Sequence, residues 1–542
     1  MSVKRSAVRI GDLLIKEGVI TSDQLEQALA AQNRSENEPL CAALSRLNIL
    51  SEEKSLPILA RQLGMEIISV DQQKISADLL KLVPARIATR YHILPVSREG
   101  QSLRVATADP LNIKVFDELQ MLTHCTILPV LVLGQQLTEA IRHYYGVGAD
   151  MVESMVDDGE LAKAAELREA AEDLDKIGGE ASTVKFVNQL LLEAVRDRAT
   201  DVHLEPYEKR LLIRYRIDGI LYEVPVSADM KRFHSGIVSR VKVMCNLNVA
   251  EHRLPQDGRT KVKVGGRDLD LRVSILPAAF GESVMIRLLS TNVVLGLEQI
   301  GLLPDHLALL EKMVVKPHGI VFVSGPTGAG KTTTLYAALA RMNDRKRKFI
   351  TIEDPIEYLM PGITQIQVHP KIDFTFAAAL RSVLRHDPDV VMLGEVRDFE
   401  TAETAIRTAL TGHLVFSTLH TNDAAGCMTR LLDMGIEPYL AASSLECAIA
   451  VRLVRLICPE CRAKGCPQCR QTGYKGRTGI FEFLVLDEDI RALVLRRASA
   501  GEITKMACSK GMRTLREDGM EKVRRGLTTI EEVMRVTEMD AS

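Results

Sequence analysis

The stretch Gly325-Pro326-Thr327-Gly328-Ala329-Gly330-Lys331-Thr332 fits the phosphate-binding pattern G-x-x-x-x-G-K-[ST] at every fixed position. The apolar run Ile320-Val321-Phe322-Val323 precedes it, and the helix-forming run Leu335-Tyr336-Ala337-Ala338-Leu339 follows it. The pattern therefore has the strand, loop and helix that it requires. Glycines in such a loop allow backbone N–H groups to approach a phosphate at the N-terminus of the helix. The stretch predicts a bound nucleoside triphosphate, which we take to be ATP, rather than a chance glycine-rich turn.

Two side chains of this loop have specific expected roles. Lys331 is expected to reach the β- and γ-phosphates, and the Thr332 hydroxyl is expected to ligate Mg²⁺. The nucleotide contacts are predicted to come from Gly325, Pro326, Thr327, Gly328, Ala329, Gly330, Lys331, Thr332 and Thr333.

The composition is that of an ordinary globular protein with several domains. The chain has 542 residues, of which 46% are apolar and 26% charged. Its formal net charge of −2 gives no global basic field, so no nucleic-acid partner is expected and a DNA-translocating motor is disfavoured. No run of about 18 apolar residues is present, and no apolar segment follows Met1-Ser2-Val3-Lys4-Arg5. We therefore predict neither a membrane span nor a secretory signal, and a cytoplasmic location.

The pattern of elements changes along the chain. Residues 1–148 indicate a mixed region of short helices and strands, and residues 149–180 indicate a charge-rich linker. Residues 181–292 indicate an α+β domain, because Asp218-Gly219 separates two apolar strands and Gly265-Gly266 marks a second hairpin turn. In residues 293–542, helical stretches separate short apolar strands at residues 320–324, 349–352, 390–393 and 414–417. This alternation predicts an α/β fold with a parallel sheet, which holds the nucleotide at the carboxyl ends of its strands.

Glu395 is the expected catalytic carboxylate. It follows the apolar strand at 390–393 and Gly394, and a carboxylate at such a strand end is positioned to orient the attacking water. Gly394 occupies the place of the usual Walker B aspartate, and Asp389 cannot replace that aspartate because it lies six residues before Glu395, about 20 Å along an extended strand. Mg²⁺ is then expected to be held by Thr332 and water. The alternative is that Glu395 is a solvated loop carboxylate.

Two further strand ends are polar. Residues 351–357 place three carboxylates after a strand, of which Glu357 is taken as the catalytic candidate. Residues 418–422 place hydroxyls, an amide and the imidazole of His420 after another. A lone histidine is more often structural than catalytic, but its position at a strand end of a phosphate-loop domain favours a γ-phosphate sensor or a relay.

Phosphoryl transfer also requires positive charge at the transition state, often from an arginine finger. Arg214 and Arg216 are two residues apart on a predicted strand, so both face the same side of their sheet. These two residues are the finger candidates, and Arg240 is the next candidate. The alternative is an ordinary solvated basic face of a strand.

Four cysteines form two C-P-x-C pairs, Cys458-Pro459-Glu460-Cys461 and Cys466-Pro467-Gln468-Cys469. Four thiolates at this spacing suit a tetrahedral, structural Zn²⁺ site within residues 458–469. Cysteines without a metal, a redox pair and an iron–sulfur cluster are the alternatives. The six other cysteines are scattered, as is typical of reduced cytosolic proteins.

Together these motifs resemble those of the traffic ATPases of type II secretion and type IV pilus assembly, the GspE/PilB kind. The regions similar to the Walker A, Asp box, Walker B and His box of that family are residues 325–332, 351–357, 387–398 and 411–422. The regions similar to its second N-terminal domain are residues 201–206, 214–219 and 253–259. The glycine at position 394 is usual in that family, so it does not indicate an inactive enzyme.

The resemblance implies a fold, an activity and partners. The implied fold is a RecA-like phosphate-loop domain at the C-terminus, preceded by an α+β domain that is PAS-like. The implied assembly is a homo-hexamer whose ATP turnover moves the two domains against each other. It drives an inner-membrane platform, with cytoplasmic docking proteins as further partners, and associates peripherally with that membrane through them. A nucleotide- or cyclic-di-GMP-responsive binding protein of the same machinery, whose ATP site is only a switch, is the alternative of a different class.

The cysteine pairs and the long N-terminal region favour an assembly motor over a pilus-retraction motor. A zinc element at this position is found in the assembly and secretion members of the family. Here the connector between the pairs, residues 462–465, is shorter than is usual in them.

The N-terminus resembles the cyclic-di-GMP-binding motif of some family members, which are of the MshE type. That motif normally occurs twice, and in the second copy, residues 39–62, Pro39, Cys41 and Asn48 replace an expected Arg, Gly and Gly. Loss of an arginine removes a bidentate phosphate contact, so this second copy is eroded. The alternative to cyclic-di-GMP binding is that this region docks another protein. The residues that resemble the first copy are Arg9, Gly11, Gly18 and Gln32.

Overall fold

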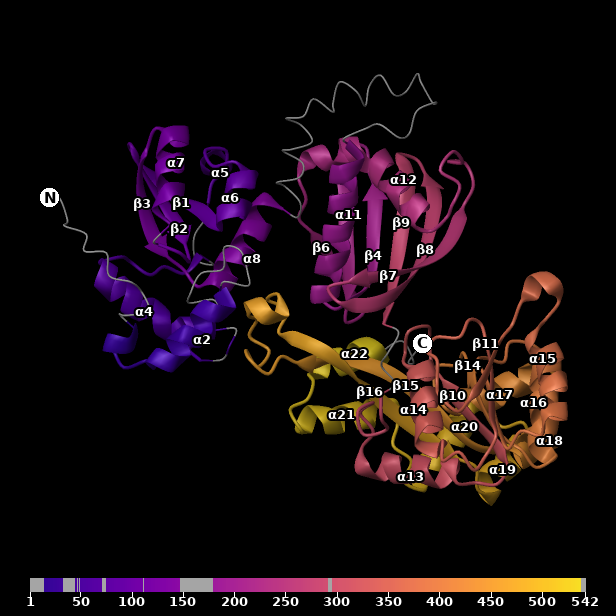
Figure 1. Ribbon diagram of the computed structural model, residues 1–542. Coiled ribbons are helices and arrows are strands. Elements are labelled where there is room, and N and C mark those ends of the chain that lie inside the picture. The colour runs from indigo at the N-terminus through magenta and orange to yellow at the C-terminus, as the bar shows by residue number, and fades with distance from the viewer. Residues whose placement is uncertain are drawn as a thin grey trace. The chain divides into compact units, whose positions relative to one another are not determined.

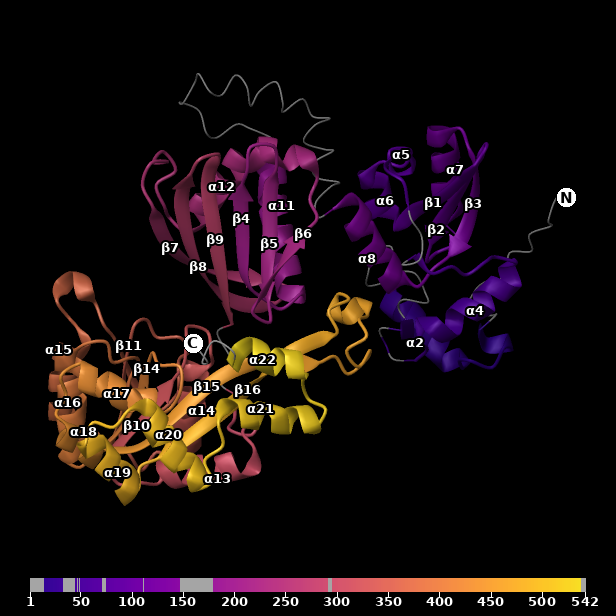
Figure 2. The same ribbon diagram turned by 180° about the vertical axis from the view of Figure 1, so that it is seen from behind.

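The computed structural model describes residues 14–32, 44–45, 47, 49–70, 75–110, 112–146, 179–290 and 295–537. The chain divides into two compact units, Met1–Leu289 and Ser290–Ser542, whose elements are labelled in Figure 1 and seen from behind in Figure 2. Of the predicted linker at residues 149–180, only Gly179 and Glu180 belong to the described part. Among the helices within these ranges, none is long and apolar enough to cross a membrane.

The first unit begins with a small mixed α/β region, as predicted. Its sheet has β2 (Ser102–Thr107) in the middle, antiparallel to β1 (Ile93–Glu99) and parallel to β3 (Thr126–Leu131). Val105 and Ala106, neighbours on β2, enter two different hydrophobic cores, so both faces of this sheet are covered. The helices are α2 (Ser22–Gln32), α4 (Glu52–Leu63), α5 (Ala77–Leu80), α6 (Ala85–Tyr91), α7 (Ile113–Thr123) and α8 (Gly134–Tyr145).

The second part of this unit is an α+β domain with a six-stranded sheet in the order β6-β5-β4-β9-β8-β7. Two α-helices and one 3-10 helix accompany the sheet, and Tyr215 donates its hydroxyl hydrogen bond to the Leu190 carbonyl at 2.8 Å. The strands are β4 (Ala199–Pro206), β5 (Leu211–Ile217), β6 (Ile220–Val224), β7 (Gln256–Val264), β8 (Arg267–Ala278) and β9 (Gly281–Ser290). The helices are α11 (Gly179–Arg196), η2 (Ala228–Phe233) and α12 (His234–Met244).

Both predicted hairpin turns of this domain are confirmed. Asp218 and Gly219 join β5 to β6 with φ angles of 49° and 90°. Gly265 and Gly266 join β7 to β8 with φ angles of 56° and 80°. Two successive left-handed residues are what a two-residue hairpin loop needs to match the twist of its strands, which explains the Asp-Gly and Gly-Gly pairs.

The second unit contains a seven-stranded sheet in the order β12-β11-β13-β14-β10-β15-β16. All neighbouring strands are parallel except β15 and β16, which are antiparallel. The four predicted apolar strands are confirmed as β10 (Gly319–Ser324), β11 (Phe349–Glu353), β13 (Val390–Leu393) and β14 (Leu414–Leu419). The remaining strands are β12 (Thr364–Gln367), β15 (Leu445–Ile457) and β16 (Tyr474–Val485).

Helices cover both faces of this sheet, so its central strands are buried along their whole length. In β10, Val321 and Val323 pack with α13 (Pro304–Val314) and α14 (Lys331–Met342), whereas Phe322 belongs to the core on the other face. The other helices are α15 (Phe376–Val383), α16 (Phe399–Leu410), α17 (Gly426–Asp433), α18 (Pro438–Ser444), α19 (Glu488–Leu495), α20 (Ala500–Ser509), α21 (Leu515–Arg524), α22 (Ile530–Thr537) and the short η3 (Pro370–Ile372), η4 (Leu384–His386) and η5 (Pro467–Cys469).

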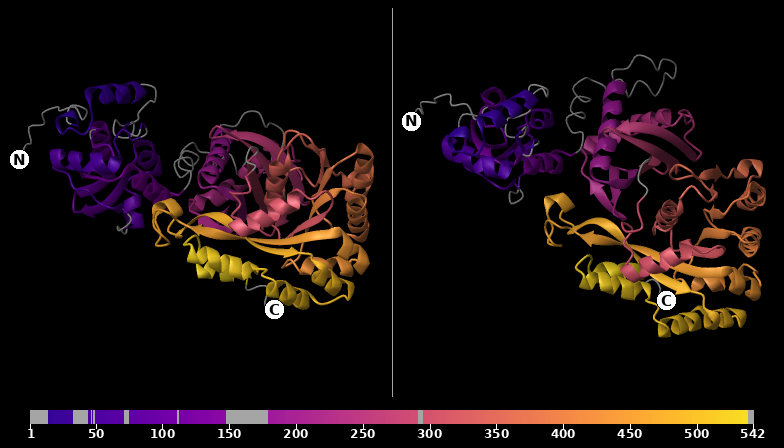
Figure 3. Two further views of the ribbon diagram at one scale, coloured as in Figure 1. Left: turned by 90° about the horizontal axis from the view of Figure 1, so that it is seen from below. Right: turned by 60° about the horizontal axis from the view of Figure 1, so that its bottom comes forward.

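The long pair β15 and β16 was not anticipated from the sequence. These strands have 13 and 12 residues, and Figure 3 shows them running along the whole unit, with α21 and α22 beside them. Their far end carries residues 458–473, which include the cysteine pairs.

Substituting Gly519 by alanine is expected to destabilise the second unit, although alanine favours a helix. A Cβ at Gly519 lies 2.6 Å from Cγ1 of Val533, which is fully buried on α22, so α21 and α22 must move apart. We expect a loss of about 1–3 kcal/mol in unfolding free energy, measured by thermal or urea unfolding. Gly501→Ala is the matched control, since nothing lies within 4 Å of its Cβ. Equal stability of the two variants contradicts this packing account.

Candidate active site

The predicted phosphate loop lies between β10 and α14, at the carboxyl end of the parallel strands. Gly325, Gly328 and Gly330 have positive φ angles of 149°, 77° and 101°. Gly325 is also sterically required, because a Cβ there lies 2.7 Å from the carbonyl oxygen of Val451 on the adjacent β15. Residues 326–328 are exposed at the tip of the loop.

Lys331 begins α14 and is buried, with 9% of its surface exposed. Its Nζ donates to the carbonyl oxygens of Gly325 at 2.7 Å and Pro326 at 3.1 Å. Burial lowers the pKa of Lys331 to about 8, and the charge of Arg452 adds to this shift while that of Glu395 opposes it. A bound phosphate therefore has to replace bonds that the ammonium makes to the loop itself. Thr332, the next residue, is exposed on the first turn of the helix.

Glu395 lies two residues beyond the end of β13, where its charge acts on Lys331. Its Oε1 is 2.5 Å from Nη2 of Arg397 and its Oε2 is 3.6 Å from Nε2 of His420, and only 13% of the side chain is exposed. The backbone around it is fixed, since Gly394 N donates to Ile352 O and Thr418 Oγ1 donates to Gly394 O, both at 2.7 Å. The structure thus brings Glu395 and His420 together.

His420 is half-exposed at the end of β14. Its pKa is lowered by partial burial and by the positive charges of Lys331 and Arg397, against the opposing effect of Glu395. The lowered pKa favours the neutral imidazole at physiological pH. Because the charges of Lys331 and Glu395 both act on His420, the charge of a nearby γ-phosphate would also change its protonation.

The three predicted carboxylates lie in different surroundings: Glu353 is the last residue of β11, and Asp354 and Glu357 follow it. Glu353 is buried, and it accepts hydrogen bonds from the hydroxyl of Tyr336 and from Thr351 Oγ1 at 2.6 Å. These bonds give Glu353 a structural task. Glu357, the predicted catalytic candidate, is partly buried in the segment between β11 and β12. Asp389 lies at the opposite end of β13 from Glu395, where it accepts from Lys348 N at 2.6 Å.

The predicted arginine fingers belong to the first unit. Arg214 and Arg216 face the same side of β5, as expected, between the buried Ile213, Tyr215 and Ile217. Both are ion-paired: Arg214 Nη2 is 2.5 Å from Glu205 Oε1, and Arg216 Nε is 3.7 Å from Asp201 Oδ2.

The sequence carries a signal for these ion pairs. Asp201 and Glu205 are four residues apart on β4, the antiparallel neighbour of β5, so both point to the face that holds the arginines. Either arginine must exchange its pair to act as a finger. Arg240, the third candidate, is partly buried on α12.

Sequence reasoning missed Arg452. This arginine lies on β15 with 6% of its surface exposed. Its Nη2 donates to Asn422 O at 2.6 Å, and its Nη1 lies 3.2 Å from a Cβ built at Gly325. Arg452 and Arg455 are two cations inside the otherwise apolar run 447–457, and they were the available signal, because a buried charge requires a partner.

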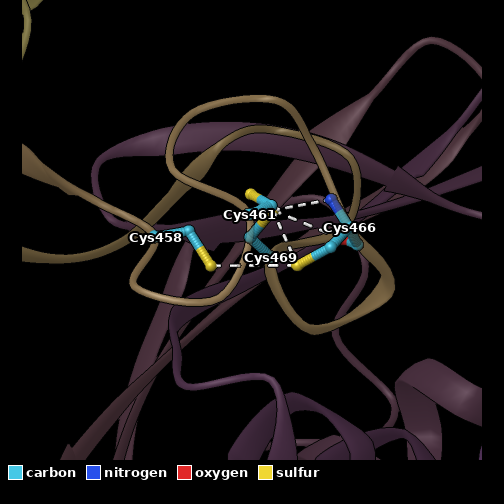
Figure 4. Close-up of side chains that lie close together, drawn as sticks. All are labelled: Cys458, Cys461, Cys466 and Cys469. Carbon is cyan, nitrogen blue, oxygen red and sulfur yellow. Dashed lines mark hydrogen bonds between the residues drawn. The ribbon is translucent and has the colours of Figure 1, made fainter.

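The four predicted cysteine ligands lie together where β15 and β16 are joined (Figure 4). All four Sγ atoms lie within 4.8 Å of one another, with 3.8 Å between Cys458 and Cys466 and 3.6 Å between Cys461 and Cys469. Zn–S bonds of about 2.3 Å in a tetrahedron separate sulfurs by about 3.8 Å. The donor set therefore fits a closed Zn²⁺ site.

Two local features prepare this site. Burial raises the pKa of Cys469, but amide donors from Cys466 and Gly473, each 3.2 Å from its Sγ, bring it down to about 7. The short connector between the cysteine pairs closes because Arg462 and Ala463 adopt left-handed φ angles of 49° and 69°.

The residues proposed to contact cyclic-di-GMP are only partly visible. Arg9 and Gly11 lie outside the described residues. Gly18 is exposed in a turn with a φ angle of 72°, and Gln32 is the last residue of α2.

Comparison with known proteins gives two family matches. The type II/IV secretion system protein family matches residues 177–535, and the MshEN domain matches residues 63–150. The second match begins after the residues that resemble the first copy of the cyclic-di-GMP motif.

Two relatives align with nearly the whole chain. The type IV pilus assembly ATPase PilB of Myxococcus xanthus is 41% identical, with 98% of this chain and 99% of that protein covered. The type II secretion system protein E of Xanthomonas campestris pv. campestris is 40% identical, with 99% and 100% covered. The structure of the ATPase DotB of Legionella pneumophila has a TM-score of 0.52 at 22% identity, covering 68% of this chain and 97% of that one, and indicates a shared fold.

The affinity of the protein for ATP is expected to fall as the pH rises above about 8. Lys331 binds phosphate as an ammonium, and its pKa is about 8 before phosphate binds. Binding above that pH must take up a proton, so the apparent Kd rises by up to about tenfold per pH unit. Calorimetry between about pH 7 and about pH 9.5 measures this slope. His420→Ala should keep it, because the pKa of His420 is already lowered, whereas a flat Kd in the wild type rules the assignment out.

Proposed function

Since this chain belongs to the type II/IV secretion system protein family, we propose that it is the cytoplasmic ATPase that powers assembly of a type IV pilus or of a type II secretion pseudopilus. It is a phosphate-loop ATPase with a RecA-like fold. The observation that carries the proposal is the grouping of Lys331, Glu395 and His420 at the carboxyl ends of three neighbouring parallel strands. The chain is 41% identical to a pilus assembly ATPase and 40% identical to a type II secretion protein, so these identities support both machines alike.

In the proposed mechanism, the loop holds the triphosphate, and three residues at strand ends act on the attacking water and the γ-phosphate. The backbone N–H groups of residues 325–333, except Pro326, which has none, and the ammonium of Lys331 bind the phosphates. Mg²⁺, when bound at the exposed Thr332, supplies additional charge for the phosphate oxygens. Glu395 orients the water and accepts its proton, and its contact with Arg397 must loosen for that step. His420 responds to the γ-phosphate, and Glu357 supports the polarisation of water from the next strand end.

The arginines are proposed to complete the charge on the transition state. Arg214 and Arg216, or Arg240 in their place, would stabilise the transferred phosphoryl group within one subunit or across to the next. Because Arg214 and Arg216 are held by Glu205 and Asp201, hydrolysis would be coupled to the exchange of these pairs. Such an exchange provides the link between ATP turnover and movement of the N-terminal α+β domain.

The assembly and the partners are proposed from the family. A homo-hexameric ring would act on an inner-membrane platform, and the first 148 residues would dock cytoplasmic proteins of the machine. The MshEN match to residues 63–150 supports a regulatory task for this region. It also favours the second candidate function, a protein of the same machinery that responds to ATP and cyclic-di-GMP without multiple turnovers. Sustained hydrolysis by the purified protein decides against that candidate.

A structural Zn²⁺ is proposed for Cys458, Cys461, Cys466 and Cys469. The support is the fit of the sulfur separations to a tetrahedron and the two amide donors at Cys469. Four sulfur ligands leave no open position, so the metal would stabilise the joint between β15 and β16 and take no part in hydrolysis.

Glu395→Gln is expected to bind ATP with nearly unchanged affinity and to hydrolyse it at least about 100-fold more slowly. The amide keeps the shape of the side chain but does not accept a proton from water. Steady-state phosphate release and nucleotide binding, measured on the same preparation, test this. Glu403→Gln is the matched control, because Glu403 is paired with Arg407 on the neighbouring helix α16. Normal hydrolysis by Glu395→Gln removes Glu395 from the mechanism.

The same variant identifies the machine. Cells that carry Glu395→Gln on the chromosome are scored separately for surface pili and for exported enzymes. Loss of pili alone assigns the motor to a pilus, and loss of export alone assigns it to secretion. Cells that retain both activities contradict the proposed function.

Purified wild-type protein is expected to contain about one zinc per chain, and Cys461→Ser is expected to lose most of it. The reason is that a hydroxyl replaces one of four thiolate ligands. Elemental analysis of protein purified without chelators provides the measurement, together with thermal unfolding, which should show a lower midpoint for the variant. Cys508→Ser serves as the control because Cys508 lies on α20 outside the cluster. Wild-type protein without zinc refutes the site.

A further inference from the structure

Arg452 lies directly beside the start of the phosphate loop. The parallel pairing of β10 with β15 ends at Ser324 and Ala450, so the next residues of β15 run level with Gly325. The close approach is measurable, since a Cβ at Gly325 lies 2.7 Å from Val451 O and 3.2 Å from Arg452 Nη1. The guanidinium therefore occupies the space next to the first residue of the loop.

The same guanidinium contacts the segment that carries His420. Its Nη2 donates to Asn422 O at 2.6 Å and its Nη1 donates to Val451 O at 3.1 Å. Asn422 is two residues beyond His420. One buried side chain thus bonds this segment while it packs against the loop.

A second bond joins the same two segments. Ser324 Oγ, at the last position of β10, donates to Asp423 O at 3.3 Å. Thr421 Oγ1 also donates to Asp423 O, at 2.9 Å, which stiffens the turn after His420. The backbone of residues 420–423 is consequently held at a fixed distance from Gly325 by polar side chains on two adjacent strands.

We propose that Arg452 is a positioning residue for ATP hydrolysis, which holds the His420 segment in register with the phosphate loop so that His420 meets Glu395 beside the γ-phosphate. This inference rests on the proposed function. An arginine is required because its planar fork presents several N–H donors in fixed directions, whereas a lysine offers one flexible ammonium. The charge of Arg452 also acts on the nucleotide site, because it lowers the pKa of Lys331.

The inference predicts a separation of turnover from binding. Arg452 is 6% exposed, and its bonds to Val451 O and Asn422 O hold the guanidinium against protein carbonyl oxygens. Its loss should therefore displace His420 without removing a phosphate contact. A displacement of about 1 Å costs up to about 100-fold in rate.

The test compares Arg452→Lys, His420→Ala and the double variant in purified full-length protein. For Arg452→Lys we expect kcat to fall by about 10- to 100-fold while the Kd for ATP stays within about threefold. In the double variant we expect kcat to fall no further than in the slower single variant, because both changes remove one arrangement. Multiplication of the two effects, or an equal loss of kcat and of ATP affinity, overturns the inference. The latter result would identify Arg452 as a phosphate ligand.

Two further variants separate this role from a loss of folding. Arg455→Lys lies three residues along β15, where Arg455 pairs with Glu532 and stacks on Tyr474. It should change the unfolding midpoint but leave kcat unchanged. If Arg452→Lys does not fold, Ser324→Ala removes the other bond to the segment, and a reduced kcat at unchanged ATP affinity is again expected. If Ser324→Ala and Arg452→Lys both hydrolyse ATP normally, this inference is wrong and the proposed function stands. If the wild-type protein does not hydrolyse ATP, the proposed function is wrong.

Discussion

The close approach between Gly325 and the backbone of Val451 is the constraint on which the nucleotide site depends. A Cβ at residue 325 lies 2.7 Å from the Val451 carbonyl oxygen, so only glycine lets β10 end against β15 and turn into the loop. That turn directs Lys331 back toward the loop carbonyls. The same close approach brings Arg452 beside the loop. Arg452 in turn bonds Asn422 O, in the segment that contains His420. The steric requirement at one residue thereby sets the positions of several charges.

Much of the ATPase fold could be predicted because its determinants are local. Each central strand is a short apolar run, and the fixed glycines and lysine of the loop lie within eight residues. Glu395 and His420 could be predicted to meet because each follows such a strand, and parallel strands end at one edge of a sheet. The hairpin turns of the first unit could be predicted for the same local reason, from Asp218-Gly219 and Gly265-Gly266.

The remaining features depend on contacts between distant residues. Arg452 lies beside the phosphate loop only because residues 445–450 pair with residues 320–324. A cation in an apolar run indicates that it has a partner, but not which one. The ion pair of Arg214 with Glu205 needs the antiparallel register of β4 and β5. The structural role of Glu353 depends on Tyr336, a residue of the helix after the phosphate loop.

The strand β15 connects two regions of different chemistry. It passes the phosphate loop at Arg452 and ends at Ile457, next to the cysteine cluster, so the two regions are about 17 Å apart along one extended strand. The antiparallel ladder to β16 resists bending along this distance. A small change in the angle of β15 at the loop therefore displaces the cysteine end by an amount proportional to this distance.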